Sequence, residues 1–150
     1  VGTFTGYGAI RIARGLAAEG RLLCCELDPE YAGVARRNLE RAGVSEKVDI
    51  ELGPAIETIR GLPEEPAYDF AYVDADKTGY PDYFEALLPR MYPGGLITFD
   101  NVFMGGRILD QEPDEGTAAM QRLNDLLVED ERVDSVMLGM ADGLTLARVR

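Results

Sequence analysis

The chain has 150 residues, 46% of them apolar, with 27 acidic residues against 15 basic ones, no histidine and a formal net charge of −12. This acidity argues against a nucleic-acid partner, because binding to phosphates relies on Lys and Arg, and without histidine any general base must be Lys, Asp, Glu or Tyr. The size predicts one domain over residues 1–150, and no apolar run approaches the roughly 20 residues that span a bilayer, so we expect a cytoplasmic protein without a membrane partner.

The chain opens on a glycine-rich turn, VGTFTGYG, which sets Gly2, Gly6 and Gly8 at the start of an apolar helical stripe over residues 7–19. We expect Val1 to be the last residue of a strand that begins upstream. Glycines let a backbone approach a ligand closely at a helix N-terminus. The spacing is GxxxGxG, whereas a dinucleotide fingerprint is GxGxxG. A tight turn that binds nothing is the alternative interpretation.

The next predicted strand, RLLCCEL (21–27), ends in an acidic residue, Glu26, 18 residues beyond the last of these glycines. A carboxylate at this position can accept both hydroxyls of a ribose, although a solvated strand end or a helix-capping partner is also possible. Cys24 and Cys25 are adjacent in this strand, so they point to opposite faces and cannot form an ordinary disulfide. They indicate core packing in a reducing compartment. A capped helix over residues 28–43 follows.

Short apolar strands and helical patterns alternate along the rest of the chain. The predicted strands cover residues 47–52, 68–74 and 95–100, and the predicted helices cover residues 78–91 and 116–130. This alternation predicts an α/β fold with a doubly wound, mostly parallel sheet. Residues 132–150 are typical of two strands joined at Asp142-Gly143, so the sheet should end in an antiparallel hairpin.

Polar residues follow two of these strands: Asp74, Asp76 and Lys77 after one, and Asp100 with Asn101 after the next. Ligands of open α/β sheets bind outside the carboxyl ends of strands, so we expect oxygens of Asp74, Asp100 and Asn101 within about 5 Å of each other around Mg²⁺. Solvated strand ends are the alternative. Lys77 either pairs with a carboxylate at the surface or lies over the metal as a catalytic base.

Together these residues resemble the cation-dependent O-methyltransferases of the caffeoyl-CoA and catechol type, which belong to the class I S-adenosylmethionine-dependent methyltransferases. The resemblance runs the full length of the chain. It rests on GTFTGYG, CELDP, LGPA, VDADK, DN and the closing DGLTLARVR, which occur in the family's order and spacing. It implies a Rossmann-like methyltransferase sheet whose N-terminal helices and most of whose first strand lie upstream of Val1.

The resemblance also implies roles for individual residues. It assigns S-adenosylmethionine binding to the glycine-rich turn, the second strand end and two later positions, namely Gly2, Thr3, Gly6, Gly8, Glu26, Ala55 and Asp76. It assigns the divalent cation to Asp74, Asp100 and Asn101, and catalysis to Asp74 with Lys77 as the base. Gly8 stands where many members have a serine, and Gly105 stands where the plant enzymes have a substrate-contacting asparagine.

The implied reaction is Mg²⁺-dependent transfer of a methyl group from S-adenosylmethionine to one hydroxyl of a vicinal diol on an aromatic small molecule. Two other interpretations stay open. One is an NAD-binding oxidoreductase domain, which Glu26 allows. The other is a non-catalytic methyltransferase-like fragment. We expect the native polypeptide to extend upstream of Val1, and we expect the 150 residues alone to form a homodimer.

Overall fold

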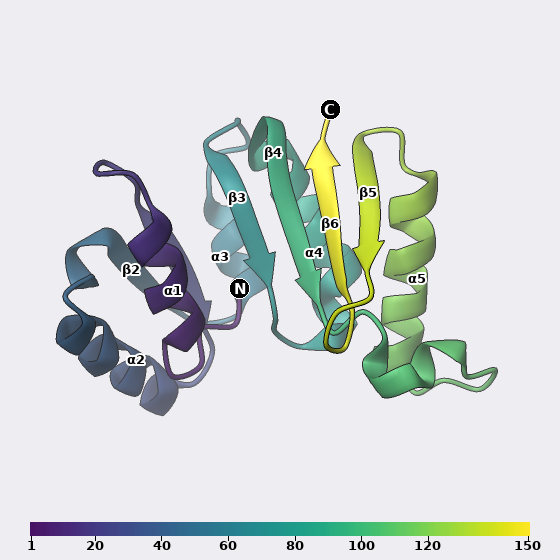
Figure 1. Ribbon diagram of the computed structural model, residues 1–150, viewed down its shortest axis with the longest axis horizontal. Coiled ribbons are helices and arrows are strands. Elements are labelled where there is room, and N and C mark those ends of the chain that lie inside the picture. The colour runs from purple at the N-terminus through teal and green to yellow at the C-terminus, as the bar shows by residue number, and fades with distance from the viewer. The chain divides into compact units, whose positions relative to one another are not determined.

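The structure is a computed structural model that describes all residues from 1 to 150. It divides into two compact units, residues 1–58 and residues 59–150. Helices and strands alternate along the chain, as Figure 1 shows. None of the helices is both long enough and apolar enough to pass through a bilayer. The single domain expected from the length stays a prediction.

The first unit contains a two-stranded parallel sheet with two helices. Its elements are α1 (Tyr7–Gly15), β1 (Leu22–Glu26), α2 (Pro29–Ala42) and β2 (Val48–Leu52). The Asp28 carboxylate accepts from two backbone N–H groups and so caps α2, which ends at Gly43 in a left-handed conformation with φ 69°. Apolar side chains from all four elements form the core of this unit, namely Ala9, Ala13, Cys24, Leu39 and Val48.

The boundary between the units falls within a short helix that was not predicted from the sequence, α3 (Ala55–Gly61). The second unit then contains β3 (Tyr68–Val73), α4 (Tyr80–Leu87), β4 (Met91–Asp100), α5 (Glu115–Glu129), β5 (Val133–Leu138) and β6 (Leu144–Val149). Its sheet has the order β3-β4-β6-β5. Strands β3 and β4 are parallel, whereas β6 is antiparallel to both β4 and β5. The α/β alternation and the antiparallel ending are therefore confirmed.

The connection between β5 and β6 is longer than the two-residue turn suggested by Asp142-Gly143, because it covers residues 139–143. Gly143 adopts φ 82°, and a Cβ there would lie 2.7 Å from the Phe103 ring and 2.8 Å from Val102. The hairpin turn therefore packs tightly against the segment that follows β4. The N–H of Phe103 donates to the Asp142 carbonyl over 2.9 Å, which ties the two segments together.

Helices α4 and α5 pack against this sheet and against each other. The fully buried side chains between them include Val73, Tyr80, Phe84, Ile97, Phe99, Met120, Leu123 and Leu127. The Tyr80 and Phe99 rings lie 5.8 Å apart, and Phe84 meets Phe99 edge-on at 6.3 Å. The carboxyl ends of β3 and β4, at the lower edge of the sheet in Figure 1, therefore rest on a well-packed aromatic core.

Candidate functional site

The glycine-rich turn of the first unit is held against the end of β1 by backbone and side-chain hydrogen bonds. The N–H of Gly2 donates to the Cys25 carbonyl over 3.1 Å, and the buried Thr3 hydroxyl donates to the same carbonyl over 2.9 Å. Gly6 adopts φ 87°, and a Cβ there would lie 3.1 Å from the Cα atom of Ala35 in α2. Gly6 is therefore required both by its conformation and by its close approach to α2.

The carboxylate of Glu26 also binds this turn, through hydrogen bonds from backbone N–H groups. It is 9% exposed, and its two oxygens accept from the N–H of Phe4 over 2.6 Å and from the N–H of Asp28 over 3.0 Å. Each carboxylate oxygen can accept a second hydrogen bond. The structure thus brings Glu26 to the turn that carries Gly2, Thr3, Gly6 and Gly8, while a contact between Glu26 and a ribose stays a prediction.

The segment after β2 also reaches the end of β1. The N–H of Gly53, which adopts φ 139°, donates to the Glu26 carbonyl over 2.9 Å. Ala55 follows two residues later and begins α3. All the cofactor residues expected in the first unit therefore lie on segments that are hydrogen-bonded to the last two residues of β1.

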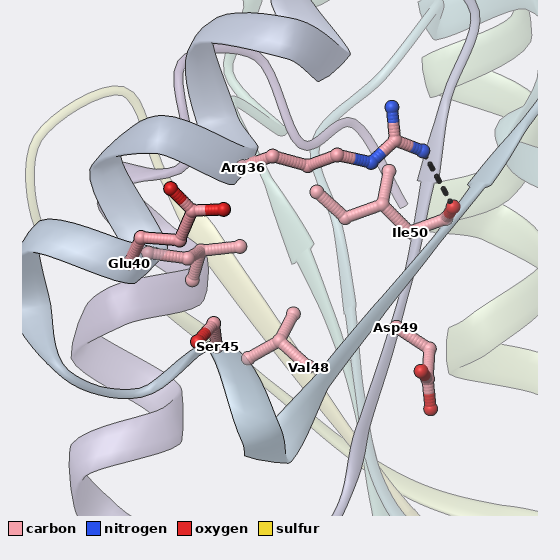
Figure 2. Close-up of a pocket in the computed structure, with 7 residues that line it drawn as sticks. Arg36, Glu40, Ser45, Val48, Asp49 and Ile50 are labelled. Atoms are coloured by element: carbon pink, nitrogen blue, oxygen red, sulfur yellow. Dashed lines mark hydrogen bonds between the residues drawn. The ribbon is translucent and has the colours of Figure 1, made fainter.

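A pocket of about 320 Å³ lies elsewhere in the first unit, beside α2 and β2 (Figure 2). It is lined by Arg36, Leu39, Glu40, Ser45, Val48, Asp49 and Ile50. The Arg36 guanidinium donates to the Ile50 carbonyl over 3.2 Å, and it thereby covers part of the free edge of β2. None of the predicted site residues lines this pocket, so it lies apart from the predicted cofactor residues.

In the second unit, the ammonium group of Lys77 lies at the centre of a polar cluster at the ends of β3 and β4. Its nitrogen donates to Asp74 Oδ1 over 3.0 Å, to Asn101 Oδ1 over 2.9 Å and to the Tyr80 hydroxyl over 2.6 Å. An ammonium has three protons, so all of them have acceptors. The structure therefore brings Asp74, Asn101 and Tyr80 together at the Lys77 nitrogen, while the roles of Asp74 and Asn101 as metal ligands and of Lys77 as the base stay predictions.

Asp100 lies beside this cluster but has different partners. Its Oδ1 accepts from the N–H of Asn101 over 2.7 Å, and its Oδ2 accepts from the Tyr72 hydroxyl. Asn101 adopts a left-handed conformation with φ 60°, which asparagine tolerates better than most residues. This conformation turns the chain directly after β4, and the Asn101 side chain bonds Lys77.

The two tyrosines report on the charge of the cluster. Burial, and then the hydrogen bond to Asp100, raises the pKa of Tyr72 well above its ordinary value. Burial, and then the charges of Asp74 and Asp100, raises the pKa of Tyr80 in the same direction. The negative charges of Asp74 and Asp100 both contribute to the raised pKa of each tyrosine, so the two carboxylates lie close to the same pair of hydroxyls. Both tyrosines therefore keep their hydroxyl protons at neutral pH.

The carboxylate of Asp76 is engaged within its own segment. It accepts from the N–H of Gly79 over 3.1 Å, from the Thr78 hydroxyl over 3.3 Å and from the Tyr83 hydroxyl over 2.5 Å. These bonds cap the single turn of 3-10 helix, Lys77–Gly79, that precedes α4. Asp76 therefore helps to set the position of Lys77, and its predicted contact with S-adenosylmethionine is not tested by these bonds.

The donor set at the ends of β3 and β4 fits a hard divalent cation in its chemistry. Asp74 and Asn101 already direct one oxygen each at a common cationic nitrogen, that of Lys77, and Asp100 adds a second carboxylate nearby. The structure contains no ready group of three or more His, Cys, Asp or Glu side chains around one point. The predicted set has two such residues, Asp74 and Asp100, beside the amide of Asn101, and its binding of a cation stays a prediction.

Comparison with known families identifies the chain's relatives. The family model described as O-methyltransferase matches residues 1–150, the whole of the chain. The chain belongs to the O-methyltransferase family. The resemblance seen in the sequence motifs is thereby confirmed.

Individual members of this O-methyltransferase family are similar to the chain over nearly its full length. "Probable caffeoyl-CoA O-methyltransferase 1" of Dictyostelium discoideum is 38% identical over 97% of this chain and 66% of its own length. "Catechol O-methyltransferase" of Niastella koreensis is 39% identical over 100% of this chain and 72% of its own length. The chain thus spans about two thirds of the length of these relatives.

A solved structure of an O-methyltransferase has the same fold. The crystal structure of TomG from Streptomyces achromogenes, in complex with SAM, superposes with a TM-score of 0.92 at 33% identity. The similarity covers 99% of this chain and 70% of TomG. The Rossmann-like methyltransferase fold that the motifs implied is therefore confirmed.

Two residues of the polar cluster, Tyr72 and Tyr80, were not singled out from the sequence. Tyr72 lies inside an apolar strand pattern and Tyr80 inside an apolar helix pattern, so both had the signature of core residues. Only the parallel pairing of β3 with β4 brings Tyr72 to Asp100, and only the fold of residues 74–80 brings Tyr80 to Lys77. The one sequence signal available was the spacing of Tyr80 three residues after Lys77.

Proposed function

We propose that the chain carries the methyl-transfer activity of its family and acts as the catalytic domain of an S-adenosylmethionine-dependent O-methyltransferase. The observation that carries this proposal is the meeting of Asp74, Asn101 and Tyr80 at the Lys77 nitrogen, beside Asp100. That cluster places a lysine and three side chains with oxygen donors at the carboxyl edge of a parallel strand pair, where α/β enzymes bind their ligands, which supports a base and a cation site there. Membership of the O-methyltransferase family supports the same reaction.

S-adenosylmethionine is proposed to bind at the first unit's glycine-rich turn. The turn combines left-handed glycines at Gly2 and Gly6 with a buried carboxylate, Glu26, whose remaining lone pairs suit ribose hydroxyls. The SAM complex of TomG, a protein of the same fold, supports this ligand. Gly8 and Ala55 complete the contacts proposed within the first unit, and the role of Asp76 toward the cofactor stays a separate prediction.

A divalent cation, with Mg²⁺ as the proposed ion, would be held by Asp74, Asp100 and Asn101. When bound, it would supply Lewis-acid stabilisation of negative charge on the oxygens of the acceptor. All three protein ligands are oxygens, which hard cations prefer over nitrogen and sulfur. A vicinal aromatic diol offers two further hard oxygens, and the name of the Niastella relative, a catechol O-methyltransferase, supports this class of acceptor.

Lys77 is proposed to accept the proton of the acceptor hydroxyl at its Nζ atom in the neutral amine form, after the ammonium has released one proton to solvent. S-adenosylmethionine supplies the methyl group to the deprotonated hydroxyl and leaves as S-adenosylhomocysteine. Lys77 is suited to this role because its side chain is only 22% exposed and its nitrogen is fixed by three partners. A fixed base contributes through orientation, since the proton is taken along one direction. No covalent bond between enzyme and substrate is required.

The test is transfer of the methyl group from S-adenosylmethionine to a panel of catechols, measured for the chain and for two variants. Lys77 and Lys47 are the two lysines of the chain, which gives a matched pair. Lys77→Met should lower turnover by about 10² or more, whereas Lys47→Met should leave it near the wild-type rate. Absence of transfer to any catechol would favour the non-catalytic alternative, and binding of NAD would favour the oxidoreductase.

Location and assembly are also proposals. Cys24 and Cys25 are buried free thiols, which supports a reducing compartment such as the cytoplasm. Several large apolar side chains are exposed on the second unit, including Phe70, Val136 and Met140, which supports a homodimer. Light scattering of the purified chain tests the dimer, and a monomer at all concentrations would contradict it.

A further inference from the structure

The hydroxyl of Tyr80 occupies the most protected position in the polar cluster. Tyr80 is the first residue of α4, and its side chain is fully buried. Its ring lies 5.8 Å from the Phe99 ring and 6.5 Å from the Tyr83 ring. These contacts fix the ring, so the position of the hydroxyl is set by the core rather than by solvent.

This single hydroxyl contacts both strand ends as well as Lys77. It lies 3.2 Å from the Val73 carbonyl and 3.1 Å from the Asp100 carbonyl, and its one proton is shared between these two acceptors. Val73 directly precedes Asp74, and Asp100 directly precedes Asn101. The Tyr80 hydroxyl therefore bridges the last backbone carbonyls of β3 and β4, next to two proposed metal ligands.

The same hydroxyl oxygen accepts from Lys77. This bond, at 2.6 Å, is the shortest of the three that the Lys77 nitrogen makes. The Lys77 nitrogen also lies 4.7 Å from the centre of the Tyr80 ring, within reach of a cation–π interaction. Of the three acceptors, Tyr80 is fully buried while the Asp74 side chain is 43% exposed. Tyr80 is therefore the most rigid of the partners that hold Lys77.

We propose that Tyr80 is a positioning residue whose hydroxyl holds the Lys77 nitrogen against the ends of β3 and β4, so that Lys77 faces the acceptor in a fixed direction. The proposal deepens the proposed function and rests on the role of Lys77 as the base. Because its side chain is fully buried, Tyr80 is proposed to act through Lys77 and not by contact with the acceptor or the methyl donor. Removal of its hydroxyl should release Lys77 while leaving the aromatic core intact.

The first test measures the freedom of Lys77 without any turnover. The chain is acetylated with limiting acetic anhydride, and mass spectrometry of its peptides gives the labelling ratio of Lys77 to Lys47. Lys47 is a suitable internal reference because its nitrogen also donates to protein acceptors, the carbonyls of Leu16 and Ala17. Tyr80→Phe should raise the ratio about tenfold, since a hydrogen bond to a charged group is lost. Tyr92 is an exposed tyrosine at the start of β4, so Tyr92→Phe should leave the labelling ratio unchanged.

An unchanged ratio in folded Tyr80→Phe would overturn the proposal. The wild-type chain provides a second measurement that needs no variant, in case Tyr80→Phe does not fold. Lys77 has a carboxylate, an amide oxygen and a buried hydroxyl as acceptors, whereas the bonds of Lys47 run to carbonyls alone. Lys77 should therefore be acetylated more slowly than Lys47, and equal or faster labelling would also overturn the proposal.

The second test separates positioning from a general structural role. Tyr80→Phe should lower kcat for methyl transfer about tenfold, with KM for the acceptor within about twofold of the wild-type value. In a Lys77→Met background the same change should cost less than about twofold, because the residue through which it acts is gone. An equal loss in both backgrounds would contradict the proposal. If the wild-type chain transfers no methyl group, the proposed function fails, while the labelling ratio still decides the role of Tyr80.

Discussion

Replacing Glu26 by glutamine tests the cofactor site, because the change is nearly isosteric but removes one acceptor. Each carboxylate oxygen of Glu26 accepts a backbone N–H, that of Phe4 over 2.6 Å and that of Asp28 over 3.0 Å. A glutamine side chain has one acceptor oxygen and one NH₂ group. In Glu26→Gln one of the two backbone N–H groups must therefore face another donor, and the glycine-rich turn loses part of its attachment to β1.

The structure sets the size of the effect. Glu26 is 9% exposed, so water compensates little for the lost bond. A hydrogen bond to a charged group contributes about 1.5–3 kcal/mol, and a buried donor without an acceptor adds a cost of its own. We therefore expect the free energy of unfolding to fall by about 2 kcal/mol or more, and the affinity for S-adenosylmethionine to fall about tenfold or more.

Urea denaturation and calorimetric titration with S-adenosylmethionine measure the two effects separately. Glu19→Gln is the matched control, because Glu19 is exposed and should change neither quantity. A loss of stability with unchanged affinity would make Glu26 a clamp of the turn alone and refute its role toward the ribose. Unchanged stability would refute the account of the turn itself.

Two further predictions concern the second unit. Arg90 is 4% exposed and donates to the carbonyls of Ala86, Arg60 and Leu62. Arg90→Leu should therefore lower the free energy of unfolding, measured by urea denaturation, by about 3 kcal/mol. A loss of less than about 1 kcal/mol would contradict this prediction. The hydrogen bond from Arg132 lowers the pKa of Asp130 below its ordinary 3.8. The stabilisation from the Asp130–Arg132 bond is therefore fully present above the ordinary pKa of Asp130 and is lost as the pH falls through its lowered pKa. Asp130→Asn should flatten the acid side of a plot of the free energy of unfolding against pH. An unchanged slope in the variant would refute this prediction.

Most strands and helices followed from local patterns, and the exceptions have physical causes. Strand β4 begins at Met91 rather than at residue 95, because Pro93 and Gly94 signal a turn in the sequence while the pairing of Met91 with Tyr68 extends the strand across a bulge. Helix α1 ends at Gly15, short of the predicted residue 19. The expected helix over residues 78–91 is divided, because Asp76 caps a separate 3-10 turn before α4.

The site could be predicted only in part for a related reason. Asp74 and Asn101 each follow an apolar strand, so parallel pairing of those strands was enough to bring them together. Which tyrosines bond to Asp100 and Lys77, in contrast, depends on how the side chains pack in the folded chain. Tyr72 reaches Asp100 from the neighbouring strand, and Tyr80 reaches Lys77 from the buried start of a helix. Neither contact has a signal in periodicity, since both residues satisfy the pattern of the core.

The dependence of methyl transfer on a divalent cation tests the central claim most directly. Transfer from S-adenosylmethionine to catechol is measured after treatment with a chelator and during readdition of Mg²⁺, for the chain, for Asp74→Asn and for Asp69→Asn, an exposed aspartate of β3. We predict that the wild-type chain and Asp69→Asn lose turnover with the chelator and regain it with Mg²⁺. Asp74→Asn should require at least about tenfold more Mg²⁺ for half-maximal turnover, because one anionic ligand is lost. Turnover that is unaffected by the chelator, or equal Mg²⁺ requirements in all three proteins, would contradict the account.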